Sequence, residues 1–150
     1  MEEPDIRSLV PQKGPMMLLD RVISASEEEL CAEVRIRPGS LFCGEDGVGA
    51  WIGIEYMAQA IGAYAGHTAR LRGEPVRIGL LLGTRRYVSS CHKFPVGSTL
   101  RVHVQRVLQN ENGLASFECR IENEQGSLAT ASLTVYQLAE GTDFPEGNPA

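Results

Sequence analysis

Polar and apolar residues alternate in "ELCAEVRIR" (29–37), near the start of the chain. One face of this segment carries Leu30, Ala32, Val34 and Ile36, and the other carries Cys31, Glu33, Arg35 and Arg37. A period of two residues is typical of a β-strand that buries one face. The apolar segment "MMLLDRVISA" (16–25) is predicted as an earlier strand.

A different pattern follows a Gly-rich segment (38–50) that is predicted as a loop. The stretch "WIGIEYMAQAIGAYAGH" (51–67) is apolar or small at nearly every position, and it does not alternate. Its length and its Ala and Met content favour a helix that is buried on all sides. We predict that this helix runs from about Trp51 to the stop signals Gly73 and Pro75.

The second half of the chain returns to short strand-like segments. They are predicted at 76–83, 85–90, 99–108, 114–122 and 128–138. Asn112-Gly113 and Gln125-Gly126 mark hairpin turns between the later strands. We predict a single domain over residues 1–138, followed by a flexible Gly/Pro-rich tail over 139–150.

One apolar helix among many strands needs a sheet that wraps around it. The order of elements therefore predicts an α+β hot-dog fold, in which a curved antiparallel β-sheet encloses a long central helix. Because a single sheet of this kind leaves edges and part of the helix open, we expect a dimer or a larger even oligomer.

Composition and charge narrow the range of functions. The chain of 150 residues has 14 Lys and Arg against 19 Asp and Glu, a formal net charge of −5, which argues against nucleic-acid binding. No apolar run reaches the length of a membrane span. Four scattered cysteines and an acidic start without a signal-peptide pattern predict a cytoplasmic protein. No motif indicates a metal ion or another cofactor.

Three segments resemble β-hydroxyacyl-acyl-carrier-protein dehydratases. "LVPQKGPMMLLDRV" (9–22) is similar to their N-terminal signature, and "GIEYMAQAIG" (53–62) is similar to their catalytic-helix motif Glu-x-Met-Ala-Gln. "FPVGSTLRVHVQR" (94–106) is similar to a later strand of the family. The resemblance covers most of the chain and is greatest to the dehydratase-like proteins of aryl-polyene and other polyketide-like pathways.

The resemblance implies a 3-hydroxyacyl-ACP dehydratase-like lyase of fatty-acid or polyketide-type biosynthesis. Its substrate is an acyl thioester on acyl carrier protein or coenzyme A. By this resemblance, Glu55 is the catalytic acid/base, it works with a histidine from the opposite subunit, and Gln59 helps to hold the site. Backbone N–H groups at the helix start suit the thioester oxygen, and Gly49 and Gly53 allow close approach. Trp51 and Phe42 are predicted as further substrate contacts.

The catalytic histidine of the family has no counterpart in the loop "SLFCGEDGVGA" (40–50). The chain contains only His67, His92 and His103. His67 follows Glu55 by twelve residues, which is about 18 Å along a helix. Neither His92, in a loop, nor His103, within an alternating strand, is an evident replacement.

Several functions remain open at this point. The chain is a dehydratase that uses Glu55 with another acid such as Glu45 or Asp46, or a hot-dog thioesterase in which Glu55 activates water. Alternatively, it is a degenerate subunit that completes an active dehydratase as a heterodimer. A fourth possibility is a hot-dog dimer that binds acyl-ACP without chemistry.

Overall fold

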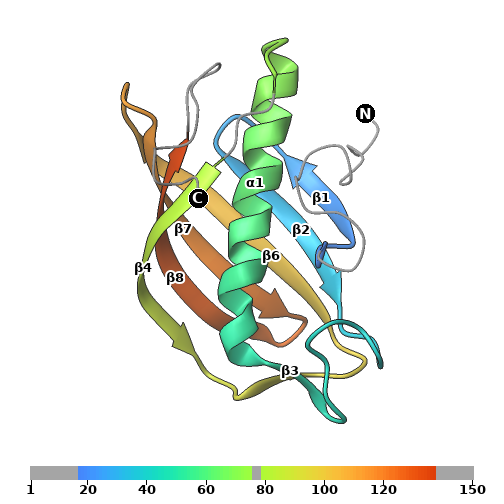
Figure 1. Ribbon diagram of the computed structural model, residues 1–150. Coiled ribbons are helices and arrows are strands. Elements are labelled where there is room, and N and C mark those ends of the chain that lie inside the picture. Colours follow the sequence, from blue (N-terminus) through green and yellow to red (C-terminus); the bar gives the residue numbers. More distant parts are fainter. Residues whose placement is uncertain (1–16, 76–78, 138–150) are drawn as a thin grey trace, which may run out of the picture.

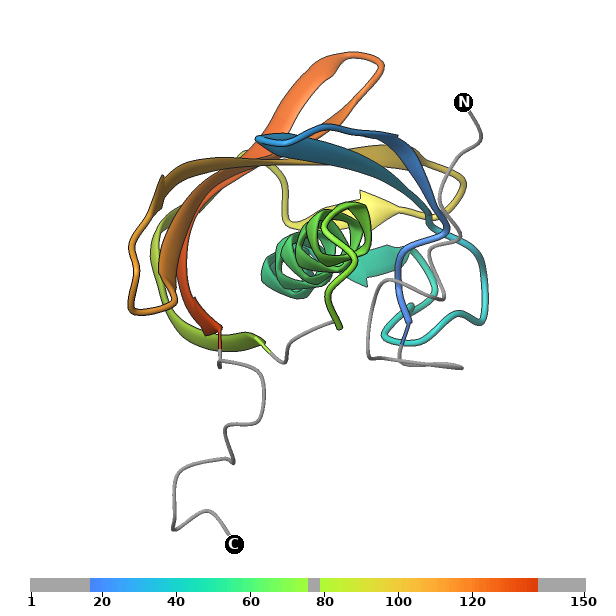
Figure 2. The ribbon, with the colours of Figure 1, turned by 90° about the horizontal axis from the view of Figure 1, so that it is seen from above.

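The computed structural model describes residues 17–75 and 79–137. In this part of the chain, one long helix lies against the concave face of a six-stranded antiparallel sheet (Figures 1 and 2). The strand order is β1-β2-β6-β7-β8-β4. The strands are β1 (Arg21–Ala25), β2 (Glu29–Arg35), β4 (Gly79–Ser89), β6 (Thr99–Gln109), β7 (Leu114–Asn123) and β8 (Gly126–Gln137). The α+β arrangement predicted from the sequence is confirmed.

The central helix α1 (Gly53–Leu71) begins directly after a short 3-10 turn, η3 (Ala50–Ile52). It ends close to the predicted position, where Gly73 adopts a φ of 69° that favours glycine. The face toward the sheet buries Tyr56, Met57, Ala60, Ala63 and Tyr64. Glu55, Ala58, Gly62 and Ala65 form another stripe of the helix, which is only half-buried. Figure 1 shows that the sheet leaves one side of α1 uncovered. The prediction of burial on all sides is therefore wrong for this stripe.

Two short strands inside predicted loops were missed. β3 (Gly47–Gly49) pairs with β5 (Lys93–Pro95) in a separate two-stranded sheet, with Val48 opposite Phe94. The ladder continues to the helix, because Ala50 N–H donates to the carbonyl of His92 at 2.9 Å. This small sheet fixes the position from which α1 starts.

β4 joins two predicted strands into one, with a bulge between Arg85 and Val88 opposite β8. The first strand is shorter than predicted, because β1 begins only at Arg21. The predicted C-terminal tail (139–150) lies outside the described residues.

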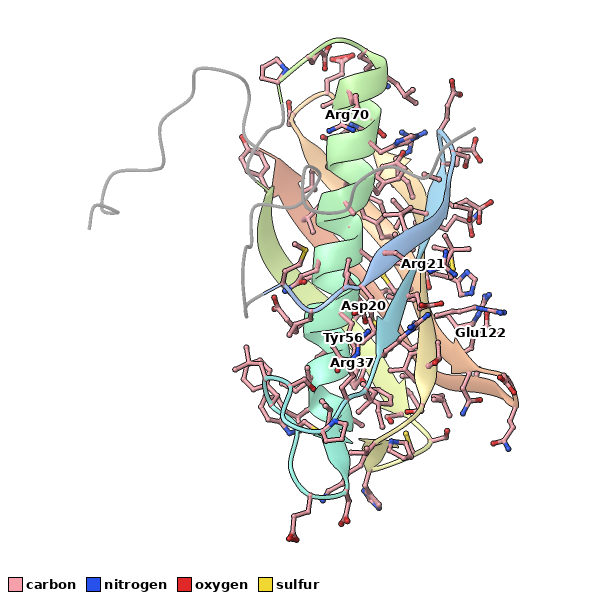
Figure 3. All side chains as sticks on the ribbon, turned by 90° about the vertical axis from the view of Figure 1, so that its right-hand side faces the viewer. Asp20, Arg21, Arg37, Tyr56, Arg70 and Glu122 are labelled. Carbon is pink, nitrogen blue, oxygen red and sulfur yellow. The ribbon has the colours of Figure 1, made fainter. Side chains whose placement is uncertain are left out.

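The Asp20-Arg21 pair at the start of β1 is tied to β2. Asp20 accepts from the backbone N–H of Arg35 at 2.6 Å and from the Arg37 guanidinium at 2.7 Å (Figure 3). Arg21 and Arg35 both donate to the carboxylate of Glu33, at 3.3 and 3.0 Å. Glu33 is only 6% exposed although it lies on the outer face of the sheet. These ion pairs fasten the edge strand β1.

Low pH is expected to weaken the ion pairs of Glu33 with Arg21 and Arg35. Burial alone would raise the pKa of Glu33, but hydrogen bonds and charges from Arg21 and Arg35 outweigh it and lower the pKa. A carboxylate with a lowered pKa stabilises the fold above its unfolded pKa of about 4.3, and this contribution is lost as pH falls through the folded pKa. Urea unfolding from pH 7 to pH 3 should therefore show a steeper loss of stability for the natural chain than for Glu33→Gln. Parallel curves for the two proteins would contradict this expectation.

Candidate active site

Glu55 lies in the first turn of α1, where the positive end of the helix dipole favours a negative charge. Its side chain is half-buried on the face that the sheet leaves open. The side-chain amide of Gln59, one turn later, donates to Glu55 Oε2 at 3.1 Å. The amide oxygen of Gln59 accepts from the backbone N–H of Leu18 at 2.9 Å.

This chain of contacts fixes the orientation of Gln59. Because its oxygen is held by a backbone N–H, its NH₂ group must point to Glu55. Gln59 is 1% exposed, so its amide bonds other groups of the protein and not solvent. Its hydrogen bond holds the Glu55 carboxylate on the side of the helix that the sheet leaves open. The segment before β1 thereby sets the position of the carboxylate, a contact that the sequence did not predict.

Gly53 and Gly49 lie at the start of the helix, as predicted, and each is closely packed. A Cβ atom at Gly53 would overlap the hydroxyl of Tyr87 and stand 3.0 Å from Ile121 Cδ1. At Gly49 a Cβ atom would stand 2.5 Å from Trp51 Nε1. Protein side chains therefore occupy the space that both glycines leave open.

Trp51 and Phe42 form an exposed aromatic pair beside the helix start. Their ring centroids are 6.3 Å apart in an edge-to-face arrangement. Trp51 is 70% exposed and Phe42 is 44% exposed, with Phe42 at a φ of 69°. Because Trp51 precedes Glu55 by four residues, the pair lies about one helical turn from the carboxylate.

The acidic loop residues Glu45 and Asp46 do not join this group in the structure. Both are exposed, and Asp46 pairs with Lys93 at 3.7 Å beside the β3–β5 sheet. Among the described residues, no three His, Cys, Asp or Glu side chains come together to hold a metal ion. No helix in the described ranges is long and apolar enough to span a membrane.

The three histidines of the chain are spread over the fold. His67 lies in α1, three turns beyond Glu55, and His92 is exposed in the connection between β4 and β5. His103 points from β6 to the outer face of the sheet, where it contacts Glu122 of β7 (Figure 3 shows Glu122 on the side away from α1). Burial alone would raise the pKa of Glu122, but Arg120 and His103 lower it. His103 therefore belongs to a surface ion-pair cluster.

The fold agrees with the comparison to known proteins. The model of the ApeP-like family, described as ApeP dehydratase, matches residues 4–146. This chain belongs to the ApeP-like dehydratase family. No curated protein matches it in sequence.

Among solved structures, this ApeP-like chain is similar to the dehydratase heterocomplex ApeI:P from Xenorhabdus doucetiae. The match has 31% identity, covers 93% of this chain and 94% of that chain, and has a TM-score of 0.86. Two matches show the hot-dog fold alone. Zebrafish thioesterase superfamily member 2 has 12% identity and a TM-score of 0.67, covering 89% and 93% of the two chains. A hypothetical thioesterase from Streptococcus pneumoniae with coenzyme A has 11% identity and a TM-score of 0.64, covering 81% and 88%.

Two contacts of the ApeP-like site were missed from the sequence, the Leu18 N–H and the Tyr87 hydroxyl. Leu18 acts through its backbone, which carries no residue-specific signal. Tyr87 lies in "RRYVSS" (85–90), which the sequence predicted only as a strand.

Proposed function

We propose that the chain is the Glu55-bearing subunit of a heterodimeric 3-hydroxyacyl-ACP dehydratase whose histidine comes from a second hot-dog subunit. The proposal rests on a site that has an oriented carboxylate but no histidine beside it among the described residues. Gln59 orients Glu55 toward the open side, while the histidines His67, His92 and His103 lie along the helix, in an exposed loop and in a surface ion pair. The related ApeI:P structure is a dehydratase heterocomplex, which supports the same kind of assembly here.

The chemistry explains why such a carboxylate requires a partner. Dehydration of a 3-hydroxyacyl thioester removes a proton from C2 and the hydroxyl from C3, and the hydroxyl leaves as water only after it is protonated. One side chain must therefore take a proton while another group donates one. Glu55 serves one end of this transfer, and a histidine of the second subunit serves the other.

Two surfaces of the chain favour a second hot-dog subunit. Within the described residues, β4 pairs with β8 alone, so its other edge is free to pair. An unpaired edge of 11 residues is normally covered in a stable protein. The half-buried stripe of α1 at Ala58, Gly62 and Ala65 carries small residues, which allow another subunit or an acyl chain to lie close to the helix. A partner on the α1 stripe would lie beside Glu55, which belongs to that stripe, and a partner on β4 would extend the sheet.

The aromatic pair suits a substrate that is partly apolar. Trp51 and Phe42 present rings to solvent about one turn from Glu55 and offer contact area for the acyl chain or its carrier arm. The N–H of Gly53 already donates to the carbonyl of Ala50, so in this proposal other backbone N–H groups of the first turn of α1 bind the thioester oxygen. In this proposal Gly53 acts by admitting Tyr87 and thereby shaping the helix start. The thioester is carried by acyl carrier protein, as in aryl-polyene biosynthesis.

Reconstitution with a histidine-bearing partner is expected to produce the activity. A β-hydroxyacyl-ACP is incubated with this chain alone, with a hot-dog homologue that carries the loop histidine, or with the co-purified pair. Intact-mass analysis should detect the loss of one water with the pair, because only the pair combines Glu55 with a histidine.

The other outcomes separate the alternatives. Water loss by this chain alone would mean that it is a self-sufficient dehydratase. Loss of the whole acyl group would identify a thioesterase. Equal activity of the homologue without this chain would reject the proposed division of catalytic residues.

A further inference from the structure

The side chain of Tyr87 crosses from the edge strand β4 to the start of the central helix. Its hydroxyl donates a hydrogen bond to the backbone carbonyl of Ala50 in η3. The same hydroxyl fills the space above Gly53, the first residue of α1. Tyr87 therefore contacts the chain on both sides of the junction between η3 and α1, two residues before Glu55.

Tyr87 lies within a β-bulge of strand β4. One additional residue is inserted between Arg85 and Val88 relative to β8, and Arg86 has a φ of 55°. A residue other than glycine in this left-handed region costs free energy, and a bulge redirects the neighbouring side chain. The side chain that follows Arg86 is Tyr87, so the irregular backbone coincides with the turn of Tyr87 toward the helix.

The side chain of Tyr87 is half-buried, and its hydroxyl lies against Gly53. Burial, with a smaller contribution from Cys91, raises the pKa of Tyr87 to about 12, so the group remains a hydrogen-bond donor at neutral pH. A Cβ atom at Gly53 would also stand 3.0 Å from Ile121 Cδ1 and 3.3 Å from Phe94 Cζ. Glycine at this position is what permits the tyrosine hydroxyl to reach the junction.

We propose that Tyr87 is a positioning residue for the reaction at Glu55, acting through Ala50 and Gly53 on the first turn of α1. The assignment rests on the proposed dehydratase function. Catalysis depends on sub-ångström placement of the reacting groups, and the first helical turn carries both Glu55 and the backbone donors for the thioester oxygen. Because β4 is also one of the two edge strands of the sheet, Tyr87 connects a surface available to a partner with the position of Glu55.

The chain contains a matched control for this contact. Tyr64 donates its hydroxyl to the backbone carbonyl of Glu27, also 37 residues away, but near the other end of the helix. Tyr87→Phe and Tyr64→Phe therefore remove the same kind of bond from α1 or its start. Each variant should lower the melting temperature by a similar amount, about 2–4 °C.

Only Tyr87→Phe should change the chemistry. In the co-purified pair, we expect kcat for water loss to fall about 3- to 10-fold at unchanged KM, the size of one lost hydrogen bond. Tyr64→Phe should retain the natural kcat. Equal kcat for both variants and the natural pair would overturn the assignment, and so would an equal fall in both.

A double-mutant cycle tests the route through Gly53. Gly53→Ala displaces the Tyr87 hydroxyl, so it should lower kcat by itself. Gly53→Ala combined with Tyr87→Phe should cost less than the product of the two single effects, because both changes act on one contact. Multiplicative effects would overturn the proposed route.

Glu55→Gln in the same pair keeps this assignment separate from the proposed function. Full activity of Glu55→Gln, or an inactive natural pair, overturns the proposed function and this assignment with it. Inactive Glu55→Gln together with fully active Tyr87→Phe overturns the assignment of Tyr87 alone.

Discussion

Glu55→Gln in the heterodimer is expected to lower the rate of water loss from β-hydroxyacyl-ACP by about 10²- to 10⁴-fold, the usual contribution of a general acid or base. Glutamine has nearly the same shape but cannot transfer the proton. The amide of Gln59 can still donate to the new side-chain oxygen at position 55, so the helix should fold as before. The change is measured by intact mass over time, and the melting temperature should stay within about 2 °C of the natural value.

The two loop acids provide the controls. Glu45→Gln and Asp46→Asn each remove an exposed carboxylate from the loop that precedes the helix. Both variants should retain full activity, because Asp46 is directed to Lys93 at 3.7 Å and Glu45 is solvent-exposed. A large loss with either variant and none with Glu55→Gln would move the catalytic carboxylate from Glu55 to this loop.

The proposal also predicts an asymmetric pair. In the proposed pair, one site would combine Glu55 with a histidine of the second subunit. The pseudo-symmetric site would face residues 40–50 of this chain, which include no histidine. Substituting the helix glutamate of the second subunit should therefore leave the rate nearly unchanged, in contrast to Glu55→Gln. Similar losses from both substitutions would mean that two equivalent sites exist.

The main elements of the fold are visible in the sequence because each has a strong local pattern. β2 follows the alternation of Leu30, Ala32 and Val34, and α1 follows the long run without alternation. The missed strand β3 is Gly-Val-Gly, which has no period and two residues that disfavour strands. Its partner strand is β5, which lies more than 40 residues away along the chain.

In the candidate site, too, some features follow from a local sequence pattern and others depend on contacts between distant segments. A glutamate and a glutamine within an apolar helix are conspicuous in a sequence, because burial of such groups requires a partner or a function. The hydrogen bond between Gln59 and Glu55 then follows from their spacing of one helical turn. The contacts of Leu18 and Tyr87 depend on how the segment before β1 and the β4 bulge meet the helix, which no local pattern specifies.

The same long-range dependence predicts a large loss of stability for Phe94→Ala. Phe94 comes from β5, is fully buried at 0% exposure, and packs on Tyr56 of α1 with a centroid distance of 5.9 Å. Truncation of a buried phenylalanine costs about 3–5 kcal/mol, because apolar contacts are lost and a cavity remains. For a domain of this size that corresponds to a fall of roughly 6–20 °C in melting temperature, measured by circular dichroism.

Phe42→Ala is the matched aromatic control. Phe42 is 44% exposed and contacts Trp51 at the surface, so its removal should cost less than about 1 kcal/mol. If Phe94→Ala were as mild as Phe42→Ala, the β3–β5 sheet would not depend on the packing of Phe94 against the helix. A large difference would mean that one side chain from a three-residue strand holds the segment from which α1 starts. In that case Phe94→Ala, assayed well below its melting temperature, should also lower kcat, because the loosened helix start carries Glu55.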